Sequence, residues 1–209
     1  MNHLPPISPA PASKKNDNPL LAEWDTRHQT PPFSRIRNEH YEPALHAAMD
    51  EARAHVEQIA AQSDTPTFEN TVVALERATE LLDRVSNLLF NMNESNTDDE
   101  LQRLAERMAP ELTRLTNRIY MDERLFRRVD TLYAQRLTLH LDAEQAMLME
   151  ETRQAFIRHG VSLDSTARRR YEENSARLAA LAQEYNRHVL ADGNAFTLHL
   201  TDRDALAGL

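Results

Sequence analysis

The nine histidines are the residues of this 209-residue chain that most invite a search for metal chemistry. None is followed by glutamate, so the sequence has no His-Glu-x-x-His pattern, which places two zinc ligands and a general base on one helix. Glu42, His46 and Asp50 are four residues apart and would share one face of a helix. A catalytic zinc site needs three well-placed ligands and a water, which one helix face rarely offers. We therefore interpret these three residues as an exposed polar stripe.

Other kinds of catalytic site are also without support. The chain has no cysteine and no glycine-rich phosphate loop, and no nucleophile elbow surrounds Ser86, Ser95 or Ser175. Carboxylates recur at helical spacing, but no catalytic pair can be singled out. His188 is expected at the edge of a core with a satisfied hydrogen bond. The sequence thus predicts no catalytic, cofactor-binding or metal-binding residue, and a helical scaffold without a self-contained active site.

The composition favours helices. Only three glycines occur, and all ten prolines lie at or before Pro110. The net charge of −9 argues against a nucleic-acid partner, because binding to phosphates depends on clustered Lys and Arg. Acidic neighbours surround the one dense basic cluster, 168–170, which we interpret as a solvated helix face. The apolar runs are too short to span a membrane, and no secretory signal is apparent, so we expect a cytoplasmic protein.

Apolar residues at helical spacing predict an antiparallel multi-helix bundle. The first helix is expected to open at Pro43, where the missing N–H costs nothing, and the second to run over 68–93. Thr97 and Glu100 have the spacing of a capping box, and Pro110 is expected to kink or split the helix that follows.

Three more helix boundaries can be read further along the chain. Asp142 with Gln145 predicts a helix start, Gly160 a helix end, and Asp164 the start of the longest helix. Its apolar or small positions alternate in steps of four and three, which predicts a coiled-coil-like antiparallel seam; they are Ala167, Tyr171, Asn174, Leu178, Leu181, Tyr185 and His188 or Val189.

The pattern changes after Gly193. Residues 195–200 alternate with period two, which predicts a strand, and no upstream segment offers a convincing partner. We therefore expect residues 194–209 to be the truncated start of a further lobe. Before it, we expect a disordered tail over 1–18 and a helical domain over 19–193.

Several stretches resemble the dipeptidyl carboxypeptidases, a branch of the thimet oligopeptidase family of zinc metallopeptidases. The most specific is Thr65-Pro66-Thr67-Phe68-Glu69-Asn70-Thr71 followed by Leu75-Glu76. The others follow in the family's order: 32–36, 40–44, 109–112, 119–120, 125–129, 139–145, 156–163 and 204–209. Phe68 and the Asn96-Thr97 segment resemble this branch more than oligopeptidase A. The resemblance covers roughly residues 18–209.

The resemblance implies the N-terminal half of a neurolysin-like, nearly all-helical fold divided by a deep channel. In that family, zinc is held by two His of a His-Glu-x-x-His helix and by a later Glu, all in the C-terminal half, and this sequence contains none of them. The resemblance implies that this segment is a channel wall, inactive alone, whose partners are the missing catalytic half and short peptides. The full-length enzyme would remove C-terminal dipeptides from oligopeptides.

Three alternatives remain open. The first is an oligopeptidase A-like endopeptidase of the same family. The second is a non-enzymatic helical interaction module, which the long seam would suit. The third is an inactive relative that only binds peptides.

Overall fold

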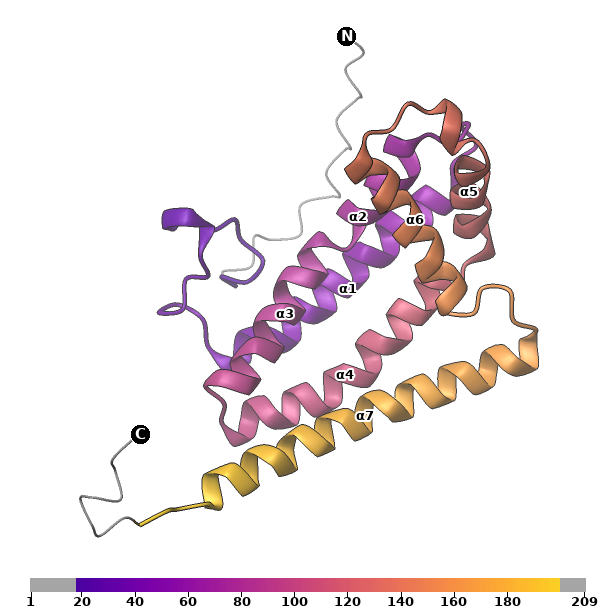
Figure 1. Cartoon of the computed structure of the whole chain (residues 1–209). Coiled ribbons are helices and arrows are strands. Elements are labelled where there is room, and N and C mark those ends of the chain that lie inside the picture. The colour runs from indigo at the N-terminus through magenta and orange to yellow at the C-terminus, as the bar shows by residue number, and fades with distance from the viewer. Residues whose placement is uncertain (1–17, 200–209) are drawn as a thin grey trace, which may run out of the picture.

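All regular structure in the part of the chain that the structure describes, residues 18–199, is helical. In this computed structural model (Figure 1) the α-helices are α1 (Asn38–Ala61), α2 (Ala74–Ala78), α3 (Glu80–Ser95), α4 (Asp99–Tyr120), α5 (Glu123–Ala134), α6 (Ala143–Arg158) and α7 (Ser165–Ala195). Two single 3-10 turns, η1 (Arg27–Gln29) and η3 (Arg136–Thr138), and a π-helical segment, η2 (Phe68–Val73), complete the list. The predicted all-α class is confirmed.

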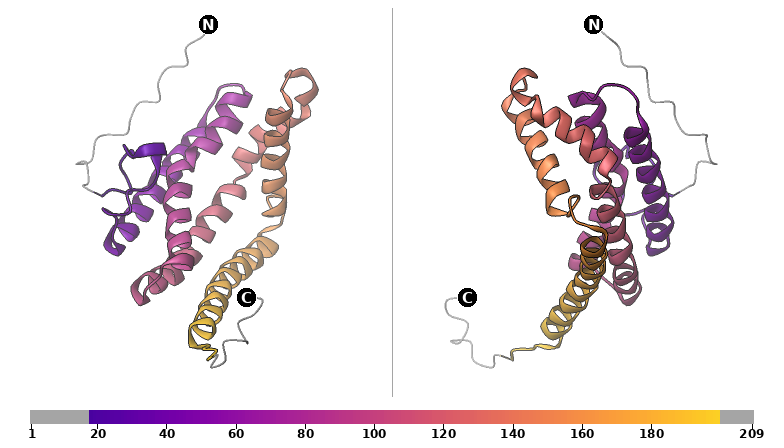
Figure 2. Two further views of the ribbon diagram at one scale, coloured as in Figure 1. Left: turned by 60° about the vertical axis from the view of Figure 1, so that its left-hand side comes forward. Right: turned by 90° about the vertical axis from the view of Figure 1, so that its right-hand side faces the viewer.

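The helices form an antiparallel bundle. Helices α1 and α3 lie side by side, α4 packs on both, and α7 packs against α4 on the far side (Figures 1 and 2). Helices α5 and α6 pair with each other at one end, next to η2. Helix α7 is the outermost of these helices, and α4 is its main neighbour.

The main core lies between α1, α3 and α4, and it follows the helical spacing of the sequence. Leu45, Met49, Val85 and Leu89 are almost completely buried there. Phe156 of α6 closes one end of this core and packs edge-on against Tyr120, with ring centroids 5.2 Å apart. Removing such a side chain usually costs about 2–5 kcal/mol. A second, smaller apolar cluster joins η2 to α5 and α6 through Phe68, Val72, Leu132 and Met149.

The first helix begins five residues earlier than expected. Its first residue is Asn38, and Pro43 lies inside it. The start is defined by Arg37 and His40, because the Arg37 amide donates to His40 Nδ1 at 3.0 Å while the His40 amide donates to the Arg37 carbonyl. This local cap supplies the helix start that we had assigned to Pro43.

The segment 68–93, predicted as one helix, is divided in two places. It opens with the π-helical turns of η2 and is interrupted again at Thr79, between α2 and α3. Thr67 caps η2, with its Oγ1 accepting from the Asn70 amide at 3.0 Å. Apolar spacing does not reveal such local changes in helical pitch, because the same side chains remain buried.

The predicted capping box of α4 was wrong by one residue. The cap is Asp98, whose Oδ1 accepts from the amides of Glu100 and Leu101 at 3.0 and 2.8 Å. The carboxylate of Asp98 follows Thr97 directly and is the stronger acceptor. Helix α4 then continues through Pro110 as one helix, so the proline does not split it.

The ends of α6 are as predicted. Asp142 and Gln145 form the reciprocal capping box, with distances of 2.9 and 3.2 Å. Gly160 has φ of +80°, the left-handed conformation that glycine tolerates best. The Val161 amide then donates to the Phe156 carbonyl at 3.2 Å. Both side chains are buried, so this turn anchors the start of the connection to α7.

Helix α7 begins at its predicted cap and runs further than expected. Asp164 Oδ1 accepts from the amides of Thr166 and Ala167, both at 2.9 Å. The helix passes through Gly193 and ends at Ala195. The strand expected over 195–200 is therefore not formed in its described part. Residue 196 has an extended backbone, but residues 18–199 supply no strand with which it could pair.

The two predicted end segments lie largely outside the described residues. Of the predicted tail, 1–18, the structure describes only Asn18, whose Nδ2 donates to the His40 carbonyl at 2.8 Å. Leu20 beside it is fully buried. Of the predicted further lobe, 194–209, residues 200–209 are outside. The division into these segments remains a prediction.

Candidate functional site

The three candidate metal ligands on α1 do not form a metal site. Glu42 accepts from Arg107 of α4 at 2.9 Å, and Asp50 accepts from Arg53 at 2.6 Å. His46 between them is exposed. Among residues 18–199, no three His, Asp or Glu side chains are grouped so that they could hold a metal ion.

The histidines discussed above are exposed or have structural roles in the described part of the chain. His40 is part of the cap of α1. His159, at the end of α6, stacks on Tyr120 with ring centroids 4.7 Å apart, and its Nδ1 lies 2.8 Å from the Ala155 carbonyl. His188 is exposed, so its predicted place at the edge of a core was wrong. The reason is that its side of α7 has no neighbouring helix in the described residues.

The predicted seam of α7 is mostly exposed. Leu178, Leu181, Tyr185 and Val189 expose 68, 42, 68 and 52% of their surface, and Asn174 is exposed too. Only the first two seam positions, Ala167 and Tyr171, are partly buried. We call the four exposed apolar residues the α7 stripe.

Small side chains occupy the partly buried side of α7 instead. They are Ser175, Ala176, Ala179 and Ala180, and α7 packs mainly against α4. Small residues let two helices approach closely without large interlocking side chains. The α7–α4 contact therefore leaves the four residues of the α7 stripe largely exposed.

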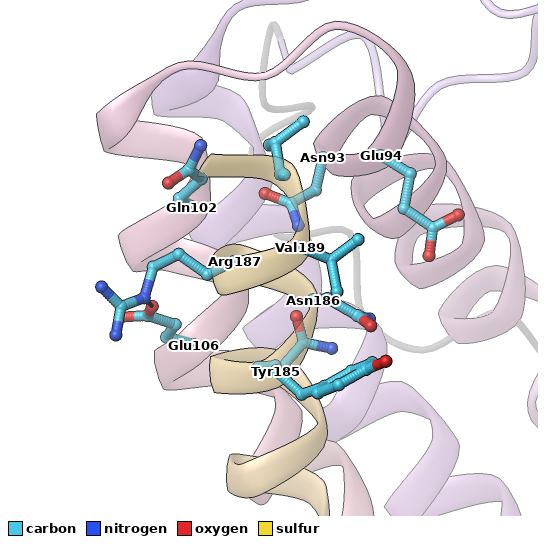
Figure 3. A pocket seen from close by; sticks show the side chains of 10 residues that line it. Asn93, Glu94, Gln102, Glu106, Tyr185, Asn186, Arg187 and Val189 are labelled. Atoms are coloured by element: carbon cyan, nitrogen blue, oxygen red, sulfur yellow. Dashed lines mark ion pairs between the residues drawn. The ribbon is translucent and has the colours of Figure 1, made fainter. Parts of the chain in front are cut away.

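A groove lies beside the C-terminal half of α7, where this helix passes the end of α3 and the start of α4 (Figure 3). It has a volume of about 330 Å³. Four carboxamides line it, from Asn93, Gln102, Gln183 and Asn186. Each of these groups can both donate and accept hydrogen bonds, as a peptide backbone does.

One ion pair and two residues of the α7 stripe complete this groove. Arg187 Nε lies 2.9 Å from Glu106 Oε1 and ties α7 to α4. Tyr185 and Val189 form part of the lining. The groove combines amides with an apolar edge and offers no nucleophile paired with a base.

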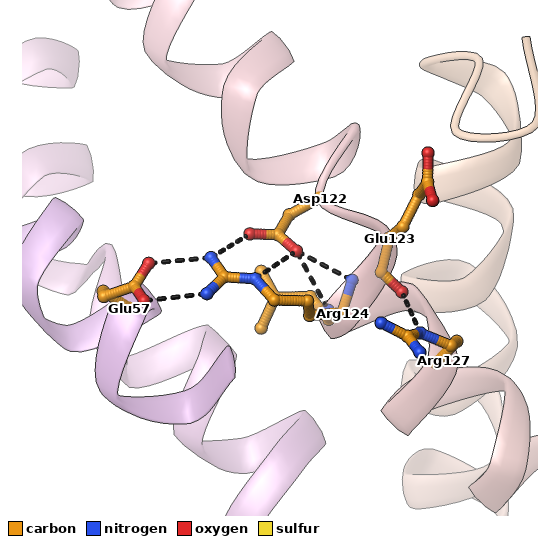
Figure 4. Close-up of polar contacts among 6 residues, drawn as sticks. Glu57, Asp122, Glu123, Arg124 and Arg127 are labelled. Atoms are coloured by element: carbon orange, nitrogen blue, oxygen red, sulfur yellow. Dashed lines mark hydrogen bonds and ion pairs between the residues drawn. The ribbon is translucent and has the colours of Figure 1, made fainter. Parts of the chain in front are cut away.

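A polar network holds α1 to the start of α5 (Figure 4). Arg124 donates to both carboxylate oxygens of Glu57 at 2.8 and 2.7 Å, and to Asp122 at 2.7 Å. Hydrogen bonding from Arg124 lowers the pKa of Glu57. Desolvation opposes the ionised form of Asp122, but its bonds from Arg124 outweigh that effect, and the pKa of Asp122 is lowered. Each carboxylate is already engaged, so this network is a structural clamp.

The sequence analysis missed Arg128 as an important residue. Its side chain is buried in α5, and its guanidinium donates to the carbonyls of Gln62 and Asp64, both at 3.1 Å. It also donates to Asn70 Oδ1 at 3.1 Å. Burial lowers the pKa of Arg128. A signal was present in the sequence, because position 128 lies three residues after Leu125 and thus on the apolar face of its helix.

Arg128 and Asn70 together shape the loop before η2. Asn70 Oδ1 also accepts from the Thr67 amide at 2.8 Å, and Asn70 Nδ2 donates to the Thr65 carbonyl at 3.0 Å. The most specific motif of the family resemblance is therefore a folded, hydrogen-bonded corner that Arg128 closes.

The chain is similar in sequence to known peptidases. No protein-family model matches the chain. No helix among residues 18–199 has the length and apolar character needed to cross a membrane.

Dipeptidyl carboxypeptidases are among its relatives. The chain is 36% identical to dipeptidyl carboxypeptidase of Escherichia coli and 38% identical to that of Salmonella typhimurium, each over 192 residues. It is 29% identical to oligopeptidase A of Escherichia coli over the same length. The resemblance to the dipeptidyl carboxypeptidase branch is thus confirmed over 92% of the chain. The chain spans about 28% of the length of these relatives, which is consistent with a match to their N-terminal part only.

Proposed function

We propose that this chain is the N-terminal, channel-wall segment of a zinc metallopeptidase that removes C-terminal dipeptides from oligopeptides. The observation that carries the proposal is the pair of matches to dipeptidyl carboxypeptidases, at 36 and 38% identity over 92% of the chain. The lower identity to oligopeptidase A, 29%, favours this branch over that one.

The catalytic groups belong, in this proposal, to polypeptide outside the 28% of the relatives that the chain matches. The acidic and histidine side chains on α1 do not fit a zinc site, because Glu42 and Asp50 are each engaged by an arginine. Zinc, where bound, would activate water as a nucleophile near neutral pH. In this proposal, the described residues of this chain form a wall of the channel and take no part in the chemical step.

The substrates in this proposal are short, flexible peptides, handled in the cytoplasm. A long, rigid wall beside a narrow channel would admit an extended peptide and exclude a folded protein.

The first test measures zinc content and peptide cleavage for purified 1–209. We expect neither bound zinc nor cleavage. Metal-dependent release of dipeptides by 1–209 alone would contradict the assignment of the catalytic groups to other polypeptide.

A non-enzymatic helical module is the second candidate, favoured by the exposed α7 stripe. Such a module would use the stripe to bind a helix of another chain. Sedimentation of 1–209 separates the two ideas, because a tight homodimer that is lost in Leu178→Asp would favour the module.

A further inference from the structure

The α7 stripe stands out among the exposed apolar residues of the described chain because it is continuous. Leu178, Leu181, Tyr185 and Val189 follow one another at spacings of three, four and four, so they lie on one side of the helix. They extend over about 16 Å. Phe196, just after the helix, is exposed as well. Scattered exposed hydrophobic residues are ordinary, whereas a continuous row marks a contact surface.

The stripe is not the surface that α7 presents to α4. At 100° per residue, the partly buried Ala176, Ala179 and Ala180 lie on a different side of α7 from Leu178 and Tyr185. The alternation of threes and fours is also the pattern with which one helix packs along another. The stripe is thus suited to a second helix, on a side of α7 that α4 does not cover.

We propose that the α7 stripe is the docking surface for the part of the peptidase that carries the catalytic centre, which places an apolar helix against it. This inference rests on the function proposed above. The two dipeptidyl carboxypeptidases and the oligopeptidase A named above are matched over only 28% of their length, so each has more than twice as much further polypeptide that could cover this helix.

The size of the stripe favours this occupant over a second copy of the chain. A stable interface between separate proteins buries about 1,200–2,000 Å² in total. Four side chains along about 16 Å of one helix are a small part of that. Two separate copies must also overcome the loss of translational and rotational freedom, which a segment of the same polypeptide largely avoids.

The groove beside the stripe gives the docking a defined edge. Tyr185 and Val189 belong to both, Asn186 lies beside Tyr185 on α7, and the carboxamides of Asn93 and Gln102 come from α3 and α4. An incoming helix with apolar residues toward the stripe and polar residues toward the groove would satisfy both surfaces. A purely apolar occupant would leave the carboxamides without partners, at a cost in free energy.

The test compares the same substitutions in two proteins. One is 1–209 alone, and the other is a chimera in which this chain replaces the matching segment of Escherichia coli dipeptidyl carboxypeptidase. Leu178→Asp and Tyr185→Asp are made in each. The control is Leu137→Asp, at an isolated apolar residue of η3 that is 88% exposed.

In 1–209 alone, we expect both stripe variants to change Tm no more than the control does, because the side chains face solvent. In the chimera, we expect the stripe variants to lower Tm by several degrees more than the control, because a carboxylate would then be buried without a partner. Equal effects of stripe and control variants in a folded chimera would overturn the proposal.

A second measurement on 1–209 alone decides the matter if the chimera does not fold. The wild type should sediment as a monomer and bind a dye specific for apolar surfaces, and Leu178→Asp with Tyr185→Asp should reduce that binding. A homodimer lost in Leu178→Asp, or a stripe that binds no dye, would overturn the proposal. A folded chimera without peptidase activity would instead count against the proposed function alone.

Discussion

Replacing Arg128 by methionine should destabilise the fold more than any other single arginine change in α5. The guanidinium makes four hydrogen bonds, to the carbonyls of Gln62 and Asp64, to Gln62 Oε1 and to Asn70 Oδ1, over 3.1–3.3 Å. Methionine keeps the apolar stem and removes all four. The loop between α1 and η2 would then lose the group that holds it to α5.

The size of the effect follows from two opposing contributions. Hydrogen bonds to a charged group contribute about 1.5–3 kcal/mol each in favourable cases. Gln62 and Asn70 are only partly buried, so water can replace some of the lost bonds. The buried charge itself is unfavourable, as the lowered pKa of Arg128 indicates, and its removal offsets part of the loss. We expect a net loss of roughly 2–4 kcal/mol, or roughly 5–12 °C in Tm for a chain of this length.

The assay is thermal and urea unfolding of 1–209 followed by circular dichroism. The matched control is Arg127→Met, one residue earlier and exposed, whose Nε donates only to the Glu123 carbonyl within α5. We expect the control to change stability by no more than about 0.5 kcal/mol. If Arg128→Met were as stable as Arg127→Met, Arg128 would not stabilise the loop between α1 and η2, and the structural role proposed for it would be refuted.

Three further changes test the helix ends. Asp142→Ala removes the capping box of α6 and should cost about 1 kcal/mol in urea unfolding, against little change for Glu144→Ala. Gly160→Ala places a Cβ at φ of +80° against a following side chain, so it should lower Tm by several degrees. Hydrogen bonding from the Leu101 amide lowers the pKa of Asp98. The ionised Asp98 carboxylate therefore stabilises the fold above about pH 4, and this stabilisation is lost as the pH falls through the lowered pKa. On acidification, Asp98→Asn should therefore lose less stability than the wild type.

The fold class could be predicted because its signals are local. Scarce glycine and apolar residues at helical spacing predicted the bundle, and short-range side-chain chemistry predicted the caps at Asp142 and Asp164. The glycine at 160 predicted a left-handed turn for the same reason. Such features depend on a few neighbouring residues, so the sequence shows them directly.

The errors arose where competing local or distant contacts decide the outcome. Asp98 replaced Thr97 as a cap because a carboxylate one residue further on is the better acceptor. Asn38 rather than Pro43 begins α1 because Arg37 and His40 cap it. The role of Arg128 depends on its hydrogen bonds to Gln62 and Asn70, whereas spacing shows only that position 128 lies on the apolar face of its helix. The division of 68–93 is a local change in helical pitch, which apolar spacing does not reveal.

The α7 stripe shows a different kind of limit. Spacing correctly identified a row of apolar residues on one side of α7, but it also predicted that this row forms a buried seam. In the described residues, α4 packs against the small side chains of α7 instead, and Leu178 and Tyr185 remain exposed. The pattern predicted the spacing of the row, and it did not show that the row stays exposed in the described residues.

The most direct test of the central claim, that this chain is a wall and the chemistry lies on other polypeptide, is to identify the peptide products by mass spectrometry. A peptide with a free C-terminus is incubated with 1–209 and, separately, with the chimera. We expect intact peptide with 1–209 and stepwise release of C-terminal dipeptides with the chimera, abolished by a zinc chelator. Dipeptide release by 1–209 itself, or a folded chimera that cleaves nothing, would contradict it.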